Sequence, residues 1–252
     1  DHHPGLVARR LAPRVMIGRF LEISVHAPDL LRSLAFYEQL GFSQVTTGEA
    51  WPYPYAVVTD GRLAIGLHQR ELQQSPLLSF VLPDLYEHLD AIEGLGVEIL
   101  DRRLGGDVFN EATFVTPGGQ LVRLLEARTF SPSDRAPGDT SRLGWFEEFV
   151  LPVADVKAAE RFWERLGFIP AEESGEPFPH IGLTSDSFDV ALVSEGTFAR
   201  PALMFTDSGM PARIRALADR GAEFARLPGK LDSTLLALLI APEGTRLLLT
   251  TA

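Results

Sequence analysis

The chain contains no cysteine, and its 34 acidic residues outnumber its 23 basic ones to give a formal net charge of −11. The absence of cysteine excludes disulfide bonds, thiolate nucleophiles and metal or cluster sites with cysteine ligands. No apolar run comes near the roughly 20 residues that a membrane-spanning helix requires. A surface that binds nucleic acid would need a clustered basic face, which this charge balance disfavours. We therefore expect a cytoplasmic protein with no nucleic-acid or membrane partner.

The N-terminal segment DHHPGLVARRLAPRV shows no periodicity, and it lacks the apolar stretch of a signal peptide. We assign residues 1–17 to a disordered arm or tag remnant. The paired His2 and His3 belong to this arm, and we do not expect them to bind a metal.

One phrase occurs twice in the chain. SLAFYEQLGF (33–42) is matched by AERFWERLGF (159–168), 126 positions later, and the similarity extends over residues 20–42 and 146–168. The segments TPGGQLVRLLEA (116–127) and APEGTRLLLTTA (241–252) also match. Between the halves, residues 129–143 are rich in Pro, Ser, Gly and Asp, a composition typical of a linker. The sequence therefore predicts two homologous domains, 18–128 and 144–252.

Each domain repeats again within itself. Asp29 and Asp84 are 55 positions apart, as are Gly41 and Gly96, so each half contains two copies of one unit. The repeat predicts four units, at residues 18–72, 76–128, 144–196 and 200–252.

Local signals give the secondary structure of a unit. RFLEISVHA alternates as a strand does, Asp29 is a candidate helix N-cap, and Leu34 and Tyr37 follow at helical spacing. Gly41 stands where a helix ends in a positive φ. YAVVTDG and RLAIGLHQ are two strands around an Asp-Gly turn. The unit is thus β-α-β-β-β, and we predict the other helices at residues 87–95, 156–166 and 212–220.

Residues 29–42, with Asp29, Ser33, Phe36, Tyr37 and the closing Leu-Gly-Phe in register, carry a recognisable signature. On it the chain resembles the vicinal oxygen chelate superfamily, which includes glyoxalase I, extradiol dioxygenases and bleomycin-resistance proteins. The resemblance covers the chain from about Gly18. It implies an α+β fold in which four βαβββ units form two domains with cupped mixed sheets, either a monomer with an internal pseudo-dimer or a homodimer.

In metal-dependent members, the resemblance implies one metal in a cup, held by up to four His, Gln or Glu side chains from the first and last strand of both units. The matching positions are Glu22, Gly66, Leu77 and Arg123 in the first domain, and Glu148, Ala191, Ala202 and Leu248 in the second. A divalent ion needs several N or O donors, and a guanidinium repels it. We therefore expect both metal sites to be lost and no cofactor to be needed.

A displaced metal site is the alternative. Strand alternation puts His26 on the face of Glu22 and His68 on the face of Gly66. Two His and one carboxylate form the facial arrangement of non-haem iron sites. With Fe, Mn, Ni or Zn on Glu22, His26 and His68, the protein would be a lyase, isomerase or dioxygenase of the glyoxalase I or extradiol type.

Without a metal, the first cup offers a cation and an acid. Arg123 could anchor a carboxylate or enolate oxygen of a ligand, while Glu22 holds a donor group or acts as a base. The opposing interpretation is that the two side chains neutralise each other.

Aromatic residues gather in the connecting segments: Trp51, Tyr53, Tyr55 and Phe109 in the first half, and Phe178 beside His180 in the second. The resemblance to bleomycin-resistance proteins implies that such residues stack on a flat ligand, although ordinary packing explains them too. Apart from Glu148, the second cup is lined by small or apolar residues, so it either binds something apolar or is filled.

No Gly-rich phosphate loop, Gly-x-Ser-x-Gly or His-Glu-x-x-His motif occurs, and no spacing predicts a nucleophile beside its base. The sequence therefore favours metal-independent binding or sequestration of a small organic molecule, aromatic or carboxylate-bearing, in the first domain. Whether the protein is an enzyme is left open.

Overall fold

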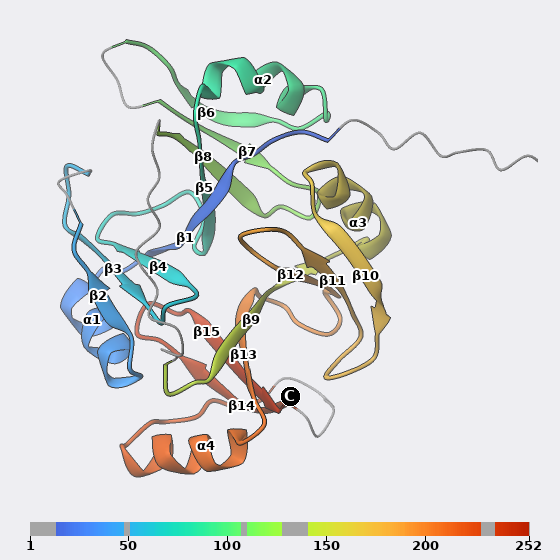
Figure 1. Cartoon of the computed structure of the whole chain (residues 1–252). Coiled ribbons are helices and arrows are strands. Elements are labelled where there is room, and N and C mark those ends of the chain that lie inside the picture. Colours follow the sequence, from blue (N-terminus) through green and yellow to red (C-terminus); the bar gives the residue numbers. More distant parts are fainter. Residues whose placement is uncertain (1–13, 48–50, 107–109, 128–140, 228–234, 252) are drawn as a thin grey trace, which may run out of the picture.

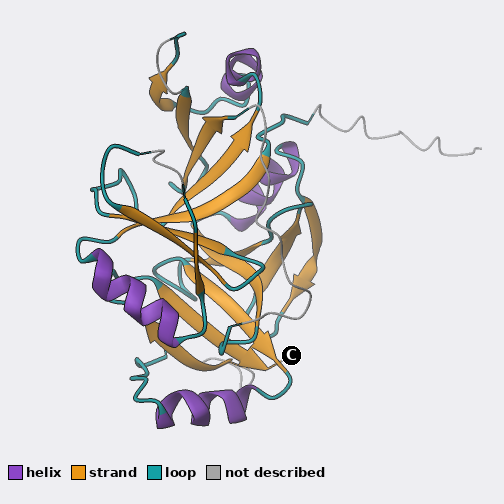
Figure 2. Ribbon diagram, turned by 60° about the vertical axis from the view of Figure 1, so that its left-hand side comes forward, coloured by secondary structure: helices purple, strands orange, loops and turns teal. Residues whose placement is uncertain are grey.

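The computed structural model describes residues 14–47, 51–106, 110–127, 141–227 and 235–251, and these form two mixed β-sheets (Figure 1). In Figure 2 the strands occupy the interior and the helices lie on the outside. Within this part of the chain, no helix has the length and apolar character needed to span a membrane. Phe109 lies outside the described residues.

The first sheet contains both units of the first half, in the strand order β2-β3-β4-β1-β5-β8-β7-β6. Its first unit consists of β1 (Arg19–His26), α1 (Leu30–Gln39), β2 (Ser43–Val45), β3 (Tyr55–Thr59) and β4 (Ala64–His68). Its second unit consists of β5 (Leu77–Leu82), α2 (Leu85–Glu93), β6 (Ile99–Arg103), β7 (Glu111–Val115) and β8 (Leu121–Glu126). The two units join where β1 runs antiparallel to β5.

The second sheet has the order β10-β11-β12-β9-β13-β15-β14. It contains β9 (Trp145–Val153), α3 (Val156–Arg165), β10 (Ile169–Ser174), β11 (His180–Thr184) and β12 (Val190–Ser194). The last unit contributes β13 (Ala202–Asp207), α4 (Met210–Asp219), β14 (Leu235–Ile240) and β15 (Arg246–Thr251), and Ala225 makes an isolated bridge to Leu238 beside them. The predicted α+β class, with sheets built from βαβββ-type units, is confirmed.

The repeated phrase works as the sequence predicts. The Asp29 side chain accepts a hydrogen bond from the Arg32 backbone N–H at 3.2 Å, which caps α1, and Asp155 does the same for α3. Gly41 then takes a φ of 90°, a conformation that other residues rarely adopt, so the chain leaves the helix there.

The boundary of the predicted N-terminal arm is wrong. Val15 and Ile17 are buried, and the Val15 N–H donates to the carbonyl of Arg165 at 2.7 Å. Residues 14–17 therefore pack against the second domain. Val15, Met16 and Ile17 form a run of only three apolar residues, which is too short to predict a structured segment.

The two domains share one hydrophobic core. Phe20 of β1 stacks on Phe188, from the segment before β12, with ring centroids 3.9 Å apart. The Ser187 hydroxyl accepts the Phe20 backbone N–H at 3.0 Å. The Tyr37 hydroxyl of α1 donates to Oε2 of Glu243, in the turn between β14 and β15, at 2.9 Å. Side chains of each domain thus cover part of the core of the other domain.

Replacing Tyr37 with Phe should destabilise the protein by roughly 1–3 kcal/mol, because it leaves the half-buried Glu243 carboxylate without its donor. Urea unfolding followed by circular dichroism measures the change. Tyr86→Phe, at a side chain 73% exposed on α2, is the matched control and should stay within about 0.5 kcal/mol of the wild type. Equal stability of the two variants would contradict the interdomain role of Tyr37.

Candidate functional site

The first cup is organised around Glu22, a carboxylate only 5% exposed on β1. Its side chain leans over Gly66 of the neighbouring strand β4. A Cβ atom at position 66 would lie 1.5 Å from Glu22 Oε2, so only glycine leaves room for the carboxylate. The sequence called Gly66 a lost metal ligand, whereas the structure shows that its missing side chain makes the space for Glu22.

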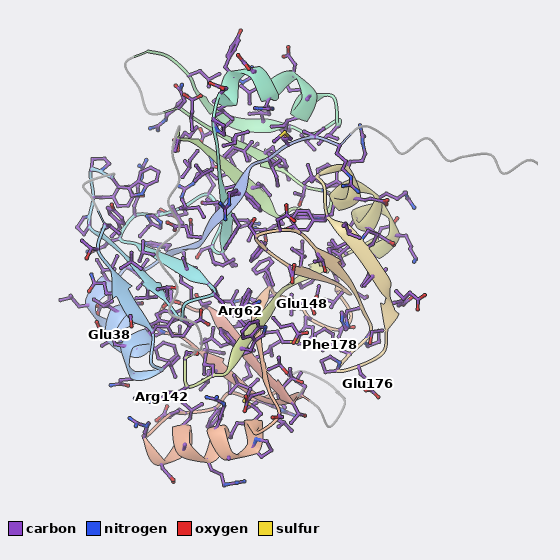
Figure 3. The ribbon with its side chains drawn as sticks, in the orientation of Figure 1. Glu38, Arg62, Arg142, Glu148, Glu176 and Phe178 are labelled. Carbon is purple, nitrogen blue, oxygen red and sulfur yellow. The ribbon has the colours of Figure 1, made fainter. Side chains whose placement is uncertain are left out.

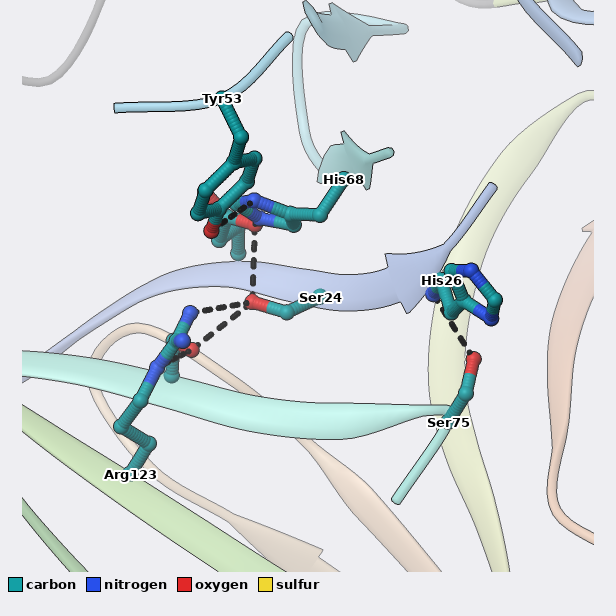
Figure 4. Close-up of polar contacts among 8 residues, drawn as sticks. Ser24, His26, Tyr53, His68, Ser75 and Arg123 are labelled. Atoms are coloured by element: carbon teal, nitrogen blue, oxygen red, sulfur yellow. Dashed lines mark hydrogen bonds and ion pairs between the residues drawn. The ribbon is translucent and has the colours of Figure 1, made fainter. Parts of the chain in front are cut away.

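Polar side chains from four strands form a hydrogen-bonded network that ends on Glu22. Figure 4 shows Ser24, His68 and Arg123 of this network. The Ser24 hydroxyl donates to Glu22 Oε2 at 2.8 Å and lies 2.8 Å from the Ser79 hydroxyl. Since the Ser24 proton is used on Glu22, Ser79 is the donor of that second bond. Arg123 Nε donates to Ser79 and its Nη2 to Ser24, both at 3.2 Å.

A second branch reaches Glu22 through His68. His68 Nε2 lies 2.8 Å from Glu22 Oε2, and the Tyr53 hydroxyl lies 3.0 Å from His68 Nδ1. An ionised carboxylate only accepts hydrogen bonds, so Nε2 carries the proton and Nδ1 accepts from Tyr53. A tyrosine hydroxyl thus lies beside a histidine ring nitrogen, a pair that no spacing in the sequence predicted. Residues 22, 53 and 68 come together only through the pairing of β1, β3 and β4.

Electrostatics keep Glu22 ionised. Burial alone would raise the pKa of Glu22, but the hydrogen bond from His68 and the positive charge of Arg123 outweigh it, so this pKa lies below its ordinary value of 4.5. For Tyr53, burial raises the pKa despite the opposing charges of Arg123 and Arg70. The phenol is thus protonated at neutral pH and available as a donor.

The predicted aromatic residues surround this network. The Tyr55 and His68 rings stack with centroids 5.9 Å apart and planes 9° apart. The Arg123 guanidinium lies 5.0 Å from the Trp51 ring centroid, and Arg70 lies 5.5 Å from that of Tyr53. All three aromatic side chains are half-buried.

Two predicted positions differ from the structure. Ser79, rather than Leu77, lies directly across from Glu22, and Leu77 pairs with Ser24. Equivalent positions of two antiparallel strands need not face each other, so a count along the repeat missed Ser79. In the second domain Met204, rather than Ala202, faces Glu148 for the same reason.

These residues do not fit a divalent metal. The four positions that would hold a metal in the first cup are Glu22, Gly66, Ser79 and Arg123. Glu22 supplies a carboxylate and Ser79 a hydroxyl, whereas Gly66 has no side chain and Arg123 is a cation. Both ring nitrogens of His68 are engaged. His26 lies apart from them, its backbone N–H bonded to the Ser75 hydroxyl at 3.1 Å (Figure 4). No group of three or more His, Asp or Glu within the described ranges is placed to hold a metal ion, so Glu22, His26 and His68 do not assemble as the alternative requires.

An open cavity of about 850 Å³ lies on the other side of Glu22, between the two domains. Arg62, which the side-chain view places in the central part of the molecule, is part of its wall (Figure 3). Phe20, Phe146 and Phe188 form its aromatic portion, and the segment 185–189 closes it from the second domain. The other charged groups of its lining are Arg19, Glu22, Glu147, Asp186 and Asp189. Sequence reasoning missed this cavity because it depends on how the domains pack.

The second cup is filled by its own side chains. Its buried apolar cluster consists of Val150, Phe178, Ala191, Val193, Phe198, Ala202, Met204, Leu235, Leu238 and Leu248. Phe178 is 2% exposed and packs edge-on against Phe198, with ring centroids 4.8 Å apart. At the edge of the cluster, His180 Nε2 lies 3.9 Å from Glu148 Oε1. Burial, together with the charges of Glu147 and Asp189, raises the pKa of Glu148 to about 8.

No protein-family profile matches the sequence, and no curated protein is detectably similar to it. Solved dioxygenase structures share its fold. An extradiol ring-cleaving dioxygenase from B. fuscum matches 97% of this chain and 74% of its own, with a TM-score of 0.66 and 19% identity. The 2,3-dioxygenase LapB from Pseudomonas sp. KL28 matches 93% of this chain and 92% of its own, with a TM-score of 0.61 and 15% identity. A catechol 2,3-dioxygenase matches 96% and 89%, with a TM-score of 0.59 and 15% identity. The chain therefore has the two-domain fold of these enzymes, as the sequence resemblance implied.

Replacing Gly66 with Ala should displace the Glu22 carboxylate and cost about 3 kcal/mol, because its charge-assisted hydrogen bonds are lost. Urea unfolding measures this loss. Gly106→Ala is the control, since a Cβ there meets nothing within 4 Å. In a Glu22→Ala background the Gly66→Ala cost should fall below about 1 kcal/mol. An undiminished cost would show that the clash is not with Glu22.

Glu148 should make the protein less stable as the pH rises. Its pKa is about 8 in the folded state against an ordinary 4.5, so the folded protein holds this proton more tightly. The contribution of Glu148 to the free energy of unfolding therefore has its full value below pH 4.5 and decreases as the pH rises toward 8.

Between pH 5 and pH 8, the free energy of unfolding of the wild type should decrease on the order of 3 kcal/mol more than that of Glu148→Gln. Urea unfolding at the two pH values compares them. Glu176→Gln, at an exposed residue of the same domain, should behave as the wild type does. Parallel pH dependence of Glu148→Gln and the wild type would refute the assignment.

Proposed function

We propose that this protein, which has the two-domain fold of the extradiol dioxygenases, binds a small organic molecule without a metal ion in the cavity between its domains. The observation that carries the proposal is the cavity of about 850 Å³ with the ionised Glu22 in its wall. Ligand pockets for small molecules are typically concave sites of this size. This cavity combines aromatic rings with charged groups.

The lining indicates what the ligand carries. Three phenylalanine rings, Phe20, Phe146 and Phe188, favour a flat or apolar body. Four carboxylates against two guanidinium groups favour a ligand that donates hydrogen bonds, such as an amine or an alcohol. Arg62 is engaged with the Phe146 carbonyl at 3.1 Å and with the Trp145 ring. A carboxylate-bearing ligand, which the sequence also suggested, would be better placed beside Arg123.

Glu22 suits the role of acceptor. Both of its hydrogen bonds within the described part of the chain go to Oε2, which leaves Oε1 able to accept from a ligand. Its ionised state at neutral pH is maintained from behind by His68 and Arg123. An amine would thus gain a charge-assisted hydrogen bond.

The second candidate is a metal-dependent enzyme, which the shared fold with dioxygenases favours. One fold hosts many activities, so this support is an analogy. The donors around Glu22 argue against it, because its carboxylate and His68 are already committed to each other.

Ligand binding can be tested by saturation-transfer NMR with small aromatic amines, alcohols and carboxylates, followed by calorimetric titration of the hits. Ala64→Phe places a ring in the cavity wall and should weaken binding of amines at least tenfold. Ala91→Phe, on the exposed face of α2, is the matched control and should leave the affinity unchanged. Failure of every compound to bind, or equal binding to Ala64→Phe, would refute a ligand site in this cavity.

Metal content discriminates the two candidates. Elemental analysis of protein purified without chelator or His tag, before and after reconstitution with Fe(II), Mn(II), Ni(II) and Zn(II), should show no stoichiometric ion. A stoichiometric metal that is lost on replacing Glu22 or His68 would establish the metal-dependent alternative instead.

A further inference from the structure

We propose that Tyr53 is an activated nucleophile at the rim of the first cup, able to take an acyl group from a small activated ester. His68 would be its base, and Glu22 the residue that holds His68 in the required tautomer. This site uses the opposite side of Glu22 from the interdomain cavity, so it does not depend on a ligand there.

The geometry is that of a nucleophile, a base and an orienting acid in line. The Tyr53 hydroxyl lies 3.0 Å from His68 Nδ1, and His68 Nε2 lies 2.8 Å from Glu22 Oε2. Both distances are within the range over which such groups share protons. Because Glu22 can only accept, the proton of His68 is fixed on Nε2 and Nδ1 is free to receive the proton of Tyr53.

Burial separates Tyr53 from the other two groups. Glu22 is 5% exposed and His68 is completely buried, whereas Tyr53 is half-buried. Tyr53 is therefore the member of the line that a molecule from solvent can reach. If the only role of Tyr53 were to donate a hydrogen bond to His68 Nδ1, any buried donor could take its place, and the donor would not have to lie at the rim.

The surroundings suit the negative charge of an acyl-transfer reaction. Arg123 and Arg70 favour a negative charge on Tyr53, whereas Glu22 and Glu111 oppose it, and the Arg70 guanidinium lies 5.5 Å from the Tyr53 ring centroid. Arg123 is held in place by Ser24 and Ser79 and by the Trp51 ring. Arg123 is thus a fixed cation, which can stabilise an oxyanion as it forms.

The step balances without any further reactant. The Tyr53 oxygen attacks the ester carbonyl as its proton passes to His68 Nδ1, and the imidazolium is stabilised by Glu22. The bond between the carbonyl carbon and the leaving oxygen then breaks, and His68 returns the proton to the leaving group. The products are acylated Tyr53 and a free alcohol or phenol, and water can later hydrolyse the acyl-tyrosine.

The probe is p-nitrophenyl acetate, with acetylated residues mapped by mass spectrometry over time. Tyr86, which is 73% exposed and remote from this network, is the internal reference in every digest. In the wild type, Tyr53 should be acetylated at least tenfold faster than Tyr86, with a burst of p-nitrophenolate that Tyr53→Phe removes.

His68→Gln and Glu22→Gln should each slow acetylation of Tyr53 at least tenfold while Tyr86 keeps its rate. Glu22→Gln leaves His68 in place, but the amide of the new side chain donates to His68 Nε2. The histidine proton then moves to Nδ1, which can no longer accept the proton of Tyr53. Circular dichroism confirms that each variant is folded. If both variants unfold, the proposal is decided by the ratio of the acetylation rates of Tyr53 and Tyr86 in the wild type.

Acetylation of Tyr53 no faster than of Tyr86, or undiminished in a folded His68→Gln variant, would overturn the proposal. Neither result bears on the interdomain cavity, whose test uses compounds that do not acylate. A ligand that binds there while Tyr53 stays inert would therefore refute only this inference.

Discussion

A single buried carboxylate determines the polar structure of the first domain. Because Glu22 is ionised, it can only accept, and this fixes the direction of every hydrogen bond around it. On one side the protons point from Arg123 through Ser79 and Ser24 to Glu22, and on the other from Tyr53 through His68. An unpaired charge at this depth would be costly, so donors on four strands are the condition for its presence.

The duplicated domain shows what happens without those donors. Glu148 occupies the position of Glu22 on β9, but apart from His180, 3.9 Å away, its neighbours in the cup are apolar, and the nearby charges of Glu147 and Asp189 are negative. Its pKa is accordingly raised to about 8, and the cup beside it is closed by packed side chains. One fold thus contains an ionised acid in a polar cup and a protonated acid beside a filled apolar one. The difference lies in the side chains on the sheet rather than in the architecture.

The sequence predicted the fold well because the fold depends on local signals that occur twice. Asp29 and Gly41 mark the ends of α1 by chemistry that needs no tertiary context, and the repeat extends this to the rest of the chain. The site was predicted less completely. The resemblance implied that Glu22 and Arg123 face one cup, and in the structure both are hydrogen-bonded to Ser24. The identity of Ser79 depended on how β1 and β5 cross. The line from Tyr53 through His68 to Glu22 depends on the pairing of three strands, and the cavity depends on the docking of residues 185–189 against the other domain. Neither is encoded in the spacing of residues along the chain.

The close approach of Glu22 to Gly66 has an evolutionary meaning. A Cβ atom at position 66 and a carboxylate reaching across it cannot coexist, so the two positions cannot drift independently. A descendant that acquired any side chain at 66 would first have to lose or redirect the acid at 22, and with it the reason for the histidine at 68. The three positions are thus linked by one steric contact.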